Sequence, residues 1–189
     1  MSTRRPIGLA LTGNCLVAVA TYAWLGWNAP AAHAAARNTA RFSLLWFAVG
    51  FATPGLERFF KRLPQEYRTI QAFAVAHCVH FATVAALVFT FEKSHLRHHA
   101  IQAALVIGIG FSITMLAGLT AAPRESRIYH AIHGTMLYLL FIIFFFAFVH
   151  HPYKPLRTLS ALLGIALVLR LTKYFAARPD RDQSAAAAG

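Results

Sequence analysis

The sequence predicts an all-α integral membrane protein that folds as a six-transmembrane-helix bundle. Of its 189 residues 58% are hydrophobic and 13% are charged, whereas a soluble domain of this size carries about a quarter charged residues. The charges are grouped between long uncharged runs, and several of the ten histidines lie inside those runs. This composition is typical of membrane proteins and excludes a soluble catalytic domain of appreciable size.

Six apolar runs supply the expected helices. Four of them can cross about 30 Å of hydrocarbon, since a helix rises about 1.5 Å per residue. These four are Ile7–Trp27, Thr69–Phe91, Ala100–Ala122 and Ile128–Val149. Two shorter runs, Phe42–Leu56 and Thr158–Leu169, can also span when the basic side chains beside them reach to the interface. The first run exceeds the usual length of a signal sequence and is expected to be an uncleaved anchor.

Lysine and arginine residues predict the orientation of these helices. Twelve of the eighteen fall on the side of both termini. The other six are Arg37, Arg41, Lys93, Arg97, Lys154 and Arg157. By the positive-inside rule both termini are cytoplasmic, in what we expect to be a bacterial inner membrane. Residues 1–6 then form a cytoplasmic N-terminus, residues 7–176 the six-helix domain and residues 177–189 a disordered cytoplasmic tail. The net charge is +12, but the basic residues do not form a stripe interleaved with aromatic residues. We therefore expect no nucleic-acid partner.

Two histidine pairs lie within the apolar runs. His77 and His80 are three residues apart, as are His130 and His133. Ionisable side chains are costly to insert in a membrane, so they usually line a pathway or bind a ligand. A spacing of three places each pair on roughly one helix face. The orientation puts all four in the cytoplasmic half or the middle of the bilayer.

Several kinds of chemistry fit four such histidines. Haem b fits best, because imidazoles from two helices can take both axial positions of the iron. A zinc site would favour carboxylates or thiolates, which the runs almost lack. Alternatively, the histidines hydrogen-bond one another between packed helices, or serve a small transporter of protons or metals. A non-redox membrane assembly protein is a further alternative.

Four short motifs resemble those of the ferric reductase-like transmembrane family. Residues 73–80 (FAVAHCVH) resemble the third-helix haem motif of that family, and in particular that of the haem-binding membrane subunits of periplasmic methionine sulfoxide reductase systems. Residues 127–133 (RIYHAIH) and Tyr138 resemble the fifth helix. Residues 52–54 (ATP) and 119–120 (LT) are similar to the ends of the second and fourth helices.

This resemblance implies a haem between the third and fifth helices, with His80 and His133 as the ligands of its iron. It also implies a second haem between His95 and His150, although their spacing from the first pair is wider than in the family. His77 and His130 are then alternative ligands or hydrogen-bond partners of the ligands. Arg127 can contact a haem propionate or anchor its helix at the interface.

The function expected from these features is that of a membrane-bound b-type cytochrome. Electrons would come from a cytoplasmic flavoprotein or from quinol and pass to an acceptor or partner reductase at the outer face. Residues 108–110 (GIG) are no dinucleotide fingerprint, because no strand precedes them. The chain is therefore expected to be an electron-transfer subunit without its own flavin or nicotinamide domain, with quinone or flavin supplied by a partner. Whether it is an enzyme in its own right stays open.

Overall fold

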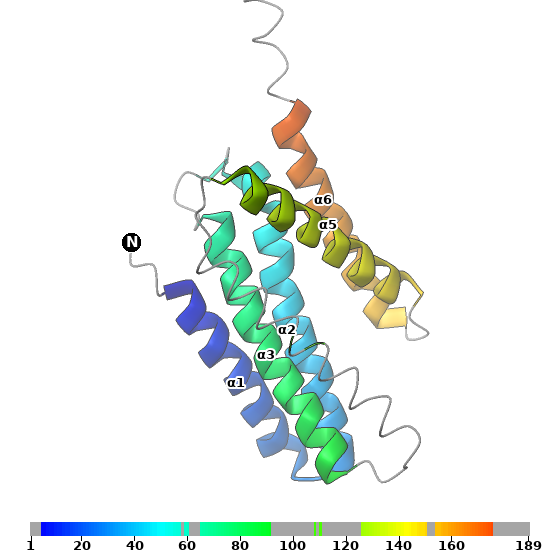
Figure 1. Ribbon diagram of the computed structural model, residues 1–189. Helices are drawn as coiled ribbons and strands as arrows, with labels where there is room; N and C mark the ends of the chain where they lie inside the picture. The colour runs from blue at the N-terminus through cyan, green and yellow to red at the C-terminus, as the bar shows by residue number, and fades with distance from the viewer. Residues whose placement is uncertain are drawn as a thin grey trace, which may run out of the picture. The chain divides into compact units, whose positions relative to one another are not determined.

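The computed structural model describes residues 5–57, 59–60, 65–91, 108, 110, 126–150 and 154–175. Within these residues the elements are all helices (Figure 1): α1 (Arg5–Leu25), α2 (Ala29–Leu56), α3 (Glu66–Thr90), α5 (Arg127–Val149) and α6 (Lys154–Phe175). The chain divides into two compact units. Unit 1 comprises Met1–Gly50 and Tyr67–Arg124, and unit 2 comprises Phe51–Glu66 and Glu125–Gly189.

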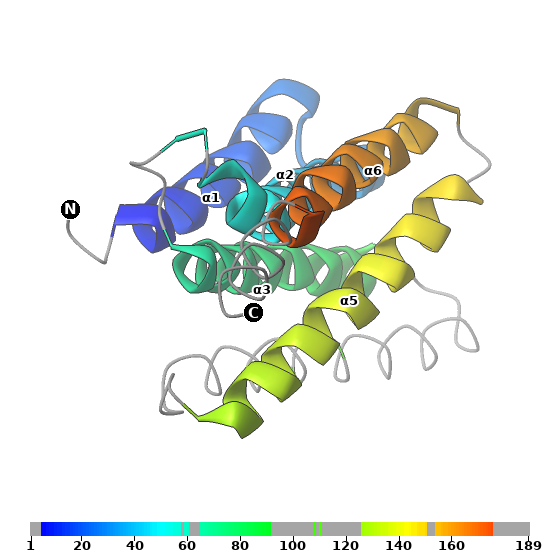
Figure 2. The same ribbon diagram turned by 90° about the horizontal axis from the view of Figure 1, so that it is seen from above.

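The connection from α1 to α2 is a tight reversal built by Gly26 and Asn28. Gly26 has a positive φ of 80°, a conformation that glycine adopts without steric cost. Asn28 donates a hydrogen bond from Nδ2 to the Leu25 carbonyl at 2.8 Å, and its Oδ1 accepts one from the Ala31 amide at 2.8 Å. One side chain thereby caps the end of α1 and the start of α2. As a result α2 runs antiparallel to α1 (Figure 2).

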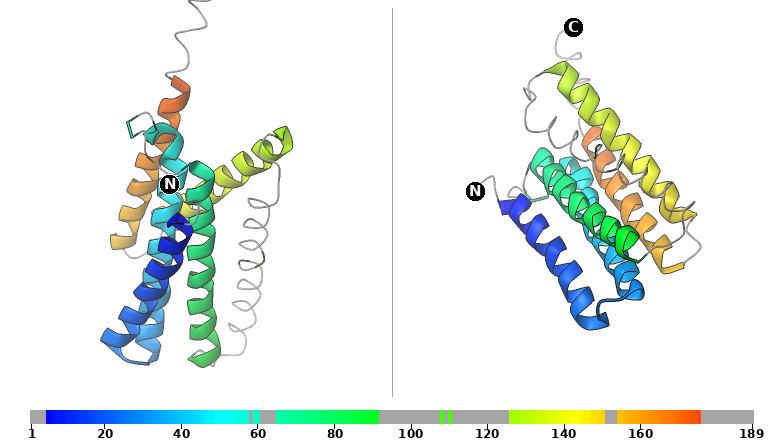
Figure 3. Two further views of the ribbon diagram at one scale, coloured as in Figure 1. Left: turned by 90° about the vertical axis from the view of Figure 1, so that its left-hand side faces the viewer. Right: turned by 60° about the horizontal axis from the view of Figure 1, so that its bottom comes forward.

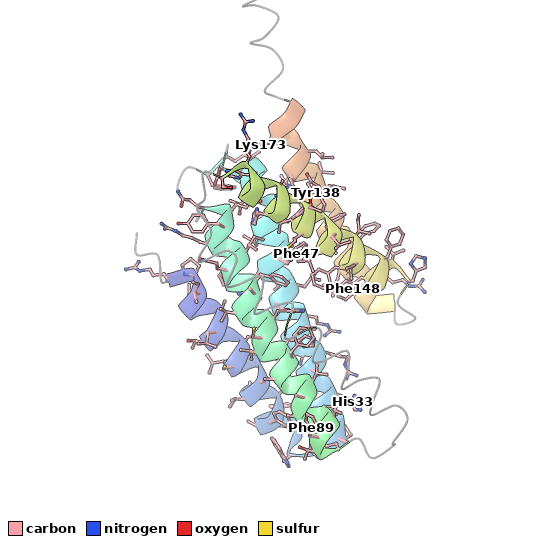
Figure 4. The ribbon with its side chains drawn as sticks, viewed as in Figure 1. His33, Phe47, Phe89, Tyr138, Phe148 and Lys173 are labelled. Carbon is pink, nitrogen blue, oxygen red and sulfur yellow. The ribbon has the colours of Figure 1, made fainter. Side chains whose placement is uncertain are left out.

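Small side chains let the helices of unit 1 pack closely. Ala10 on α1 is buried with Ala72 and Ala76 on α3, and the half-buried Phe42 and Trp46 of α2 pack against them. A second such cluster joins the start of α2 to the end of α3 through Ala32, Ala36 and Leu87. Figure 4 accordingly shows His33 and Phe89 at the same end of this unit. Close approach of small residues is the usual means by which helices associate in membranes.

Unit 2 joins the last two turns of α2 to α5 and α6, which lie side by side (Figure 3). Phe51 stacks on Phe141 with ring centroids 4.9 Å apart and meets Tyr138 edge-on at 5.4 Å. Gly55 lies directly against the Leu169 carbonyl of α6. A side chain at position 55 would collide with that backbone, so glycine there permits the contact.

Within the described residues, the helices α1 and α3 are long and apolar enough to cross a membrane. Within their most apolar stretches only 17% of the residues of α1 and 39% of those of α3 are buried. The core helix of a soluble protein is mostly buried, whereas most residues of these two stretches are not. A shorter apolar stretch, His133–Val149, lies in α5.

The expectation of a six-transmembrane-helix bundle with haem between the third and fifth helices is therefore wrong for the described part of the chain. Helix α2 is a single 28-residue helix whose first half includes Arg37 and Arg41, so it is not a short span beginning at Phe42. Helix α6 carries Arg157, Arg170 and Lys173, which lower its hydropathy. The expected fourth span, Ala100–Ala122, lies outside the described residues except for two glycines, and the expected tail 177–189 lies wholly outside them.

Candidate functional site

Five polar side chains of unit 1 meet between α2 and α3 and form what we call the histidine–hydroxyl cluster. They are Thr39 and Ser43 on α2 and His77, His80 and Thr83 on α3. The two α2 residues are four positions apart and the three α3 residues follow at intervals of three, so each set lies on one helix face. Thr39 and Ser43 are 0% and 1% exposed. Polar groups buried this deeply need hydrogen-bond partners, and here they find one another.

Each histidine ring has its Nδ1 atom beside a hydroxyl of α2, and His80 also hydrogen-bonds the Ala36 backbone. The Ser43 Oγ lies 3.1 Å from the Nδ1 of His77, and the Thr39 Oγ1 lies 3.3 Å from the Nδ1 of His80. The Thr39 hydroxyl also lies 3.0 Å from that of Thr83. The sequence-predicted pair on α3 is thus part of a continuous interhelical network.

The backbone contacts of these hydroxyls assign the ring tautomers. Ser43 donates its single hydrogen to the Ala40 carbonyl at 2.9 Å, so toward His77 its oxygen must accept. The Thr39 hydroxyl similarly donates to the Ala35 carbonyl at 2.8 Å, which it shares with the Ala36 carbonyl at 3.1 Å. In both neutral rings Nδ1 therefore carries the hydrogen, and Nε2 is the basic atom.

The contact between Thr39 and Thr83 introduces two alternative hydrogen-bond arrangements. The Thr83 hydroxyl donates to the His80 carbonyl at 2.7 Å, and the Thr39 hydroxyl donates to its own helix. A hydrogen bond between the two hydroxyls at 3.0 Å requires one of them to leave its carbonyl. The arrangements differ only by rotation of a hydroxyl group, which is a rapid motion.

Aromatic rings enclose the two imidazoles. His77 lies between Phe73, at 5.1 Å between ring centroids, and Phe81, which it meets edge-on at 4.6 Å. The His80 ring lies 5.4 Å from Phe81 and 5.4 Å from the His77 ring. Apolar enclosure lowers the local dielectric and strengthens the hydrogen bonds within the cluster.

The other predicted site residues lie elsewhere. His130 is exposed and His133 half-buried on α5 of unit 2, and Arg127 is exposed at the start of that helix. His150, just beyond α5, is also exposed and its Nδ1 lies 3.1 Å from the Phe146 carbonyl. The structure therefore brings His77 together with His80 but leaves His150 at a helix end. His95 lies outside the described residues.

A buried ion pair in unit 2 was missed in the sequence. Arg170 of α6, which is 7% exposed, donates to Glu66 Oε1 at 2.8 Å, to the Phe51 carbonyl at 2.9 Å and to the Tyr138 hydroxyl at 3.2 Å. Its guanidinium also stacks over the Phe51 ring at 4.7 Å. These contacts tie α6 to the end of α2, to the first turn of α3 and to α5, on which Figure 4 marks Tyr138. The sequence signal was weak, because α6 also carries Lys154, Arg157 and Lys173.

Comparison with known proteins does not assign the chain to a family. No protein-family model matches the chain, and neither a curated protein nor a solved structure does. The resemblance to ferric reductase-like transmembrane proteins therefore stays a prediction from the motifs.

The expectation of haem b is corrected by the structure. The described residues contain no group of three or more His, Cys, Asp or Glu side chains that could hold a metal ion. His77 and His80 project from one face of α3, and two rings on one face cannot occupy both axial positions of an iron atom. We therefore do not assign haem b to this protein as a cofactor, nor the quinone or flavin that a partner would supply.

Proposed function

We propose that this protein is embedded in a membrane and relays protons through the histidine–hydroxyl cluster between α2 and α3. The observation that carries the proposal is the bonding of both imidazole Nδ1 atoms to hydroxyls buried in an apolar helix interface. Such residues inside a membrane span commonly belong to proton pathways.

The exposed surface of α1 supports a membrane environment. Leu9, Leu16 and Val19 are 64%, 61% and 63% exposed although they lie in the middle of an apolar helix. In water this surface would carry an unfavourable free energy of hydration, whereas lipid tails solvate it without cost. Only 17% of the most apolar stretch of α1 is buried, whereas a core helix is mostly buried.

Helix length and end residues agree with the thickness of a bilayer. From Arg5 to Trp24 α1 covers about 28 Å, and from Arg68 to Phe89 α3 covers about 31 Å, at about 1.5 Å per residue. Trp24 is 88% exposed, which is typical of a tryptophan at the lipid interface. Basic residues at the opposite ends support a cytoplasmic start for both helices. His80 would then lie about 18 Å along α3 from Arg68, near the middle of the bilayer.

The cluster provides a path along which a proton moves in steps between neighbouring atoms. A proton binds to Nε2 of His80, and the Nδ1 proton of the resulting imidazolium passes to the Thr39 oxygen. Thr39 releases its own hydrogen to the Thr83 oxygen, and Thr83 passes one to a water molecule. Rotation of the hydroxyls, and a rotation of the imidazole that turns its Nε2–H toward Thr39 and its bare Nδ1 toward the entry side, prepare the path for the next proton.

Electron transfer, the function expected from the sequence, stays a prediction together with its quinol or protein partners. Contacts among the described residues favour the proton relay, because they link proton donors to proton acceptors. The alternative of a histidine-dependent proton transporter, left open by the sequence, is thus the one we adopt.

Proton flux into sealed liposomes tests this proposal. The purified full chain is reconstituted with a pH indicator inside, and a potassium gradient with valinomycin supplies the driving voltage. We expect flux above that of protein-free liposomes, and about a hundredfold loss in His80→Ala, the low end of the usual contribution of a proton-transferring side chain. The matched control is His33→Ala, which removes an exposed histidine from α2 of the same unit and should retain the wild-type flux.

Two results would overturn the proposal. One is a flux that is equal in the wild type and in His80→Ala. The other is a reduced-minus-oxidised b-type haem spectrum of the purified protein that disappears in His80→Ala, since that would make His80 an iron ligand and restore electron transfer as the function.

A further inference from the structure

Asn14 is a fully buried amide on α1 that faces α3. Its exposed fraction is 0%. The Nδ2 group donates a hydrogen bond across the interface to the carbonyl of Ala76. That bond fixes the orientation of the amide, because the opposite orientation would bring two oxygens together. The Oδ1 atom therefore points to a definite place in the interface.

The Oδ1 atom of Asn14 has no hydrogen-bond partner among the residues that the structure describes. Its neighbours in the core are the small side chains of Ala10, Ala72 and Ala76, with Phe42 and Trp46 packed against them. Burying an amide oxygen without a hydrogen-bond donor costs free energy, because the oxygen loses the hydrogen bonds that it makes to water in the unfolded chain.

We infer that Asn14 Oδ1 and α3 form a buried binding site for a water molecule. Water is the smallest hydrogen-bond donor, and buried waters typically satisfy polar groups of this kind. The site lies beside Ala76, which immediately precedes His77 and whose carbonyl receives the Asn14 bond. Helix α1 would thus hold a water one residue from the cluster. This inference does not rest on the proposed relay, since it concerns a different interface of α3.

Radiolytic hydroxyl-radical labelling of the full chain in nanodiscs tests the site. A bound water is split in place by X-rays and labels the side chains that it touches. We expect labelling of Phe42 and Trp46 in the wild type and its loss in Asn14→Leu, which has a similar volume but no acceptor. Phe47, which is 0% exposed and lies on the same helix, is the internal control and should stay unlabelled in both.

Two results would contradict the water site. Equal labelling of Phe42 and Trp46 in the wild type and in folded Asn14→Leu would overturn the site. Should Asn14→Leu fail to fold, the wild type alone decides: Phe42 labelled no faster than Phe47 contradicts a bound water. If the proton-flux experiment contradicted the relay, the labelling result would still stand, because labelling does not depend on the relay.

Discussion

Replacing Arg170 by methionine is expected to destabilise unit 2 by about 3–5 kcal/mol, the usual cost of breaking a buried ion pair by removing one partner. The substitution would leave the Glu66 carboxylate without its cation and the Phe51 carbonyl and Tyr138 hydroxyl without their donor. Thermal or denaturant unfolding in detergent, followed by circular dichroism, measures the loss.

Two further variants make the Arg170 experiment specific. Glu66→Gln should cost less than Arg170→Met, because the amide oxygen still accepts from the guanidinium. Lys173→Met removes an exposed cation from the same helix (Figure 4) and should change stability little. Equal stabilities of Arg170→Met and Lys173→Met would show that the buried network does not hold unit 2 together.

Gly55→Ala is expected to be the second most damaging change, with a loss of about 1–3 kcal/mol or more from overpacking. The new Cβ would collide with the Leu169 carbonyl and come within 2.9 Å of the Thr172 hydroxyl oxygen. Backbone atoms cannot rotate away as a flexible side chain can, so α2 and α6 would have to separate. The unfolding midpoint in detergent is the measurement.

Gly164→Ala is the matched control for Gly55→Ala. It also lies within a helix of unit 2, and a Cβ there meets nothing within 4 Å. Alanine favours helix over glycine by about 1 kcal/mol, so this variant should be as stable as the wild type or more so. If Gly55→Ala matched it, the close approach of α2 to α6 would be refuted.

The histidine pair of α3 was predictable, whereas its partners were not. His77 and His80 stand out as ionisable residues within an apolar run, which is a local signal. Thr39 lies between Arg37 and Arg41, whose charges favour an outer loop over a helix interface, so the sequence does not single it out. Hydroxyls are common throughout membrane helices, and only the packing of α2 on α3 shows which of them meet the imidazoles.

The extent of α2 and the number of spans were misjudged for a related reason. The alanine-rich start of α2 favours helix strongly, but its two arginines suggested a connection between spans. The Arg170–Glu66 pair could not be foreseen, since its members are 104 residues apart in the sequence and each alone resembled an interfacial charge. Hydropathy predicts where a chain is apolar, and the pairing of distant charges depends on the fold.

The most direct test of the relay is the proton flux of Thr39→Val in sealed liposomes. This variant retains both histidines and nearly the shape of the side chain but removes the hydroxyl that links His80 to Thr83. The account predicts that the flux falls about a hundredfold, as in His80→Ala, because the link from His80 to Thr83 is lost. A flux equal to that of the wild type would contradict the assignment of the histidine–hydroxyl cluster as the proton path.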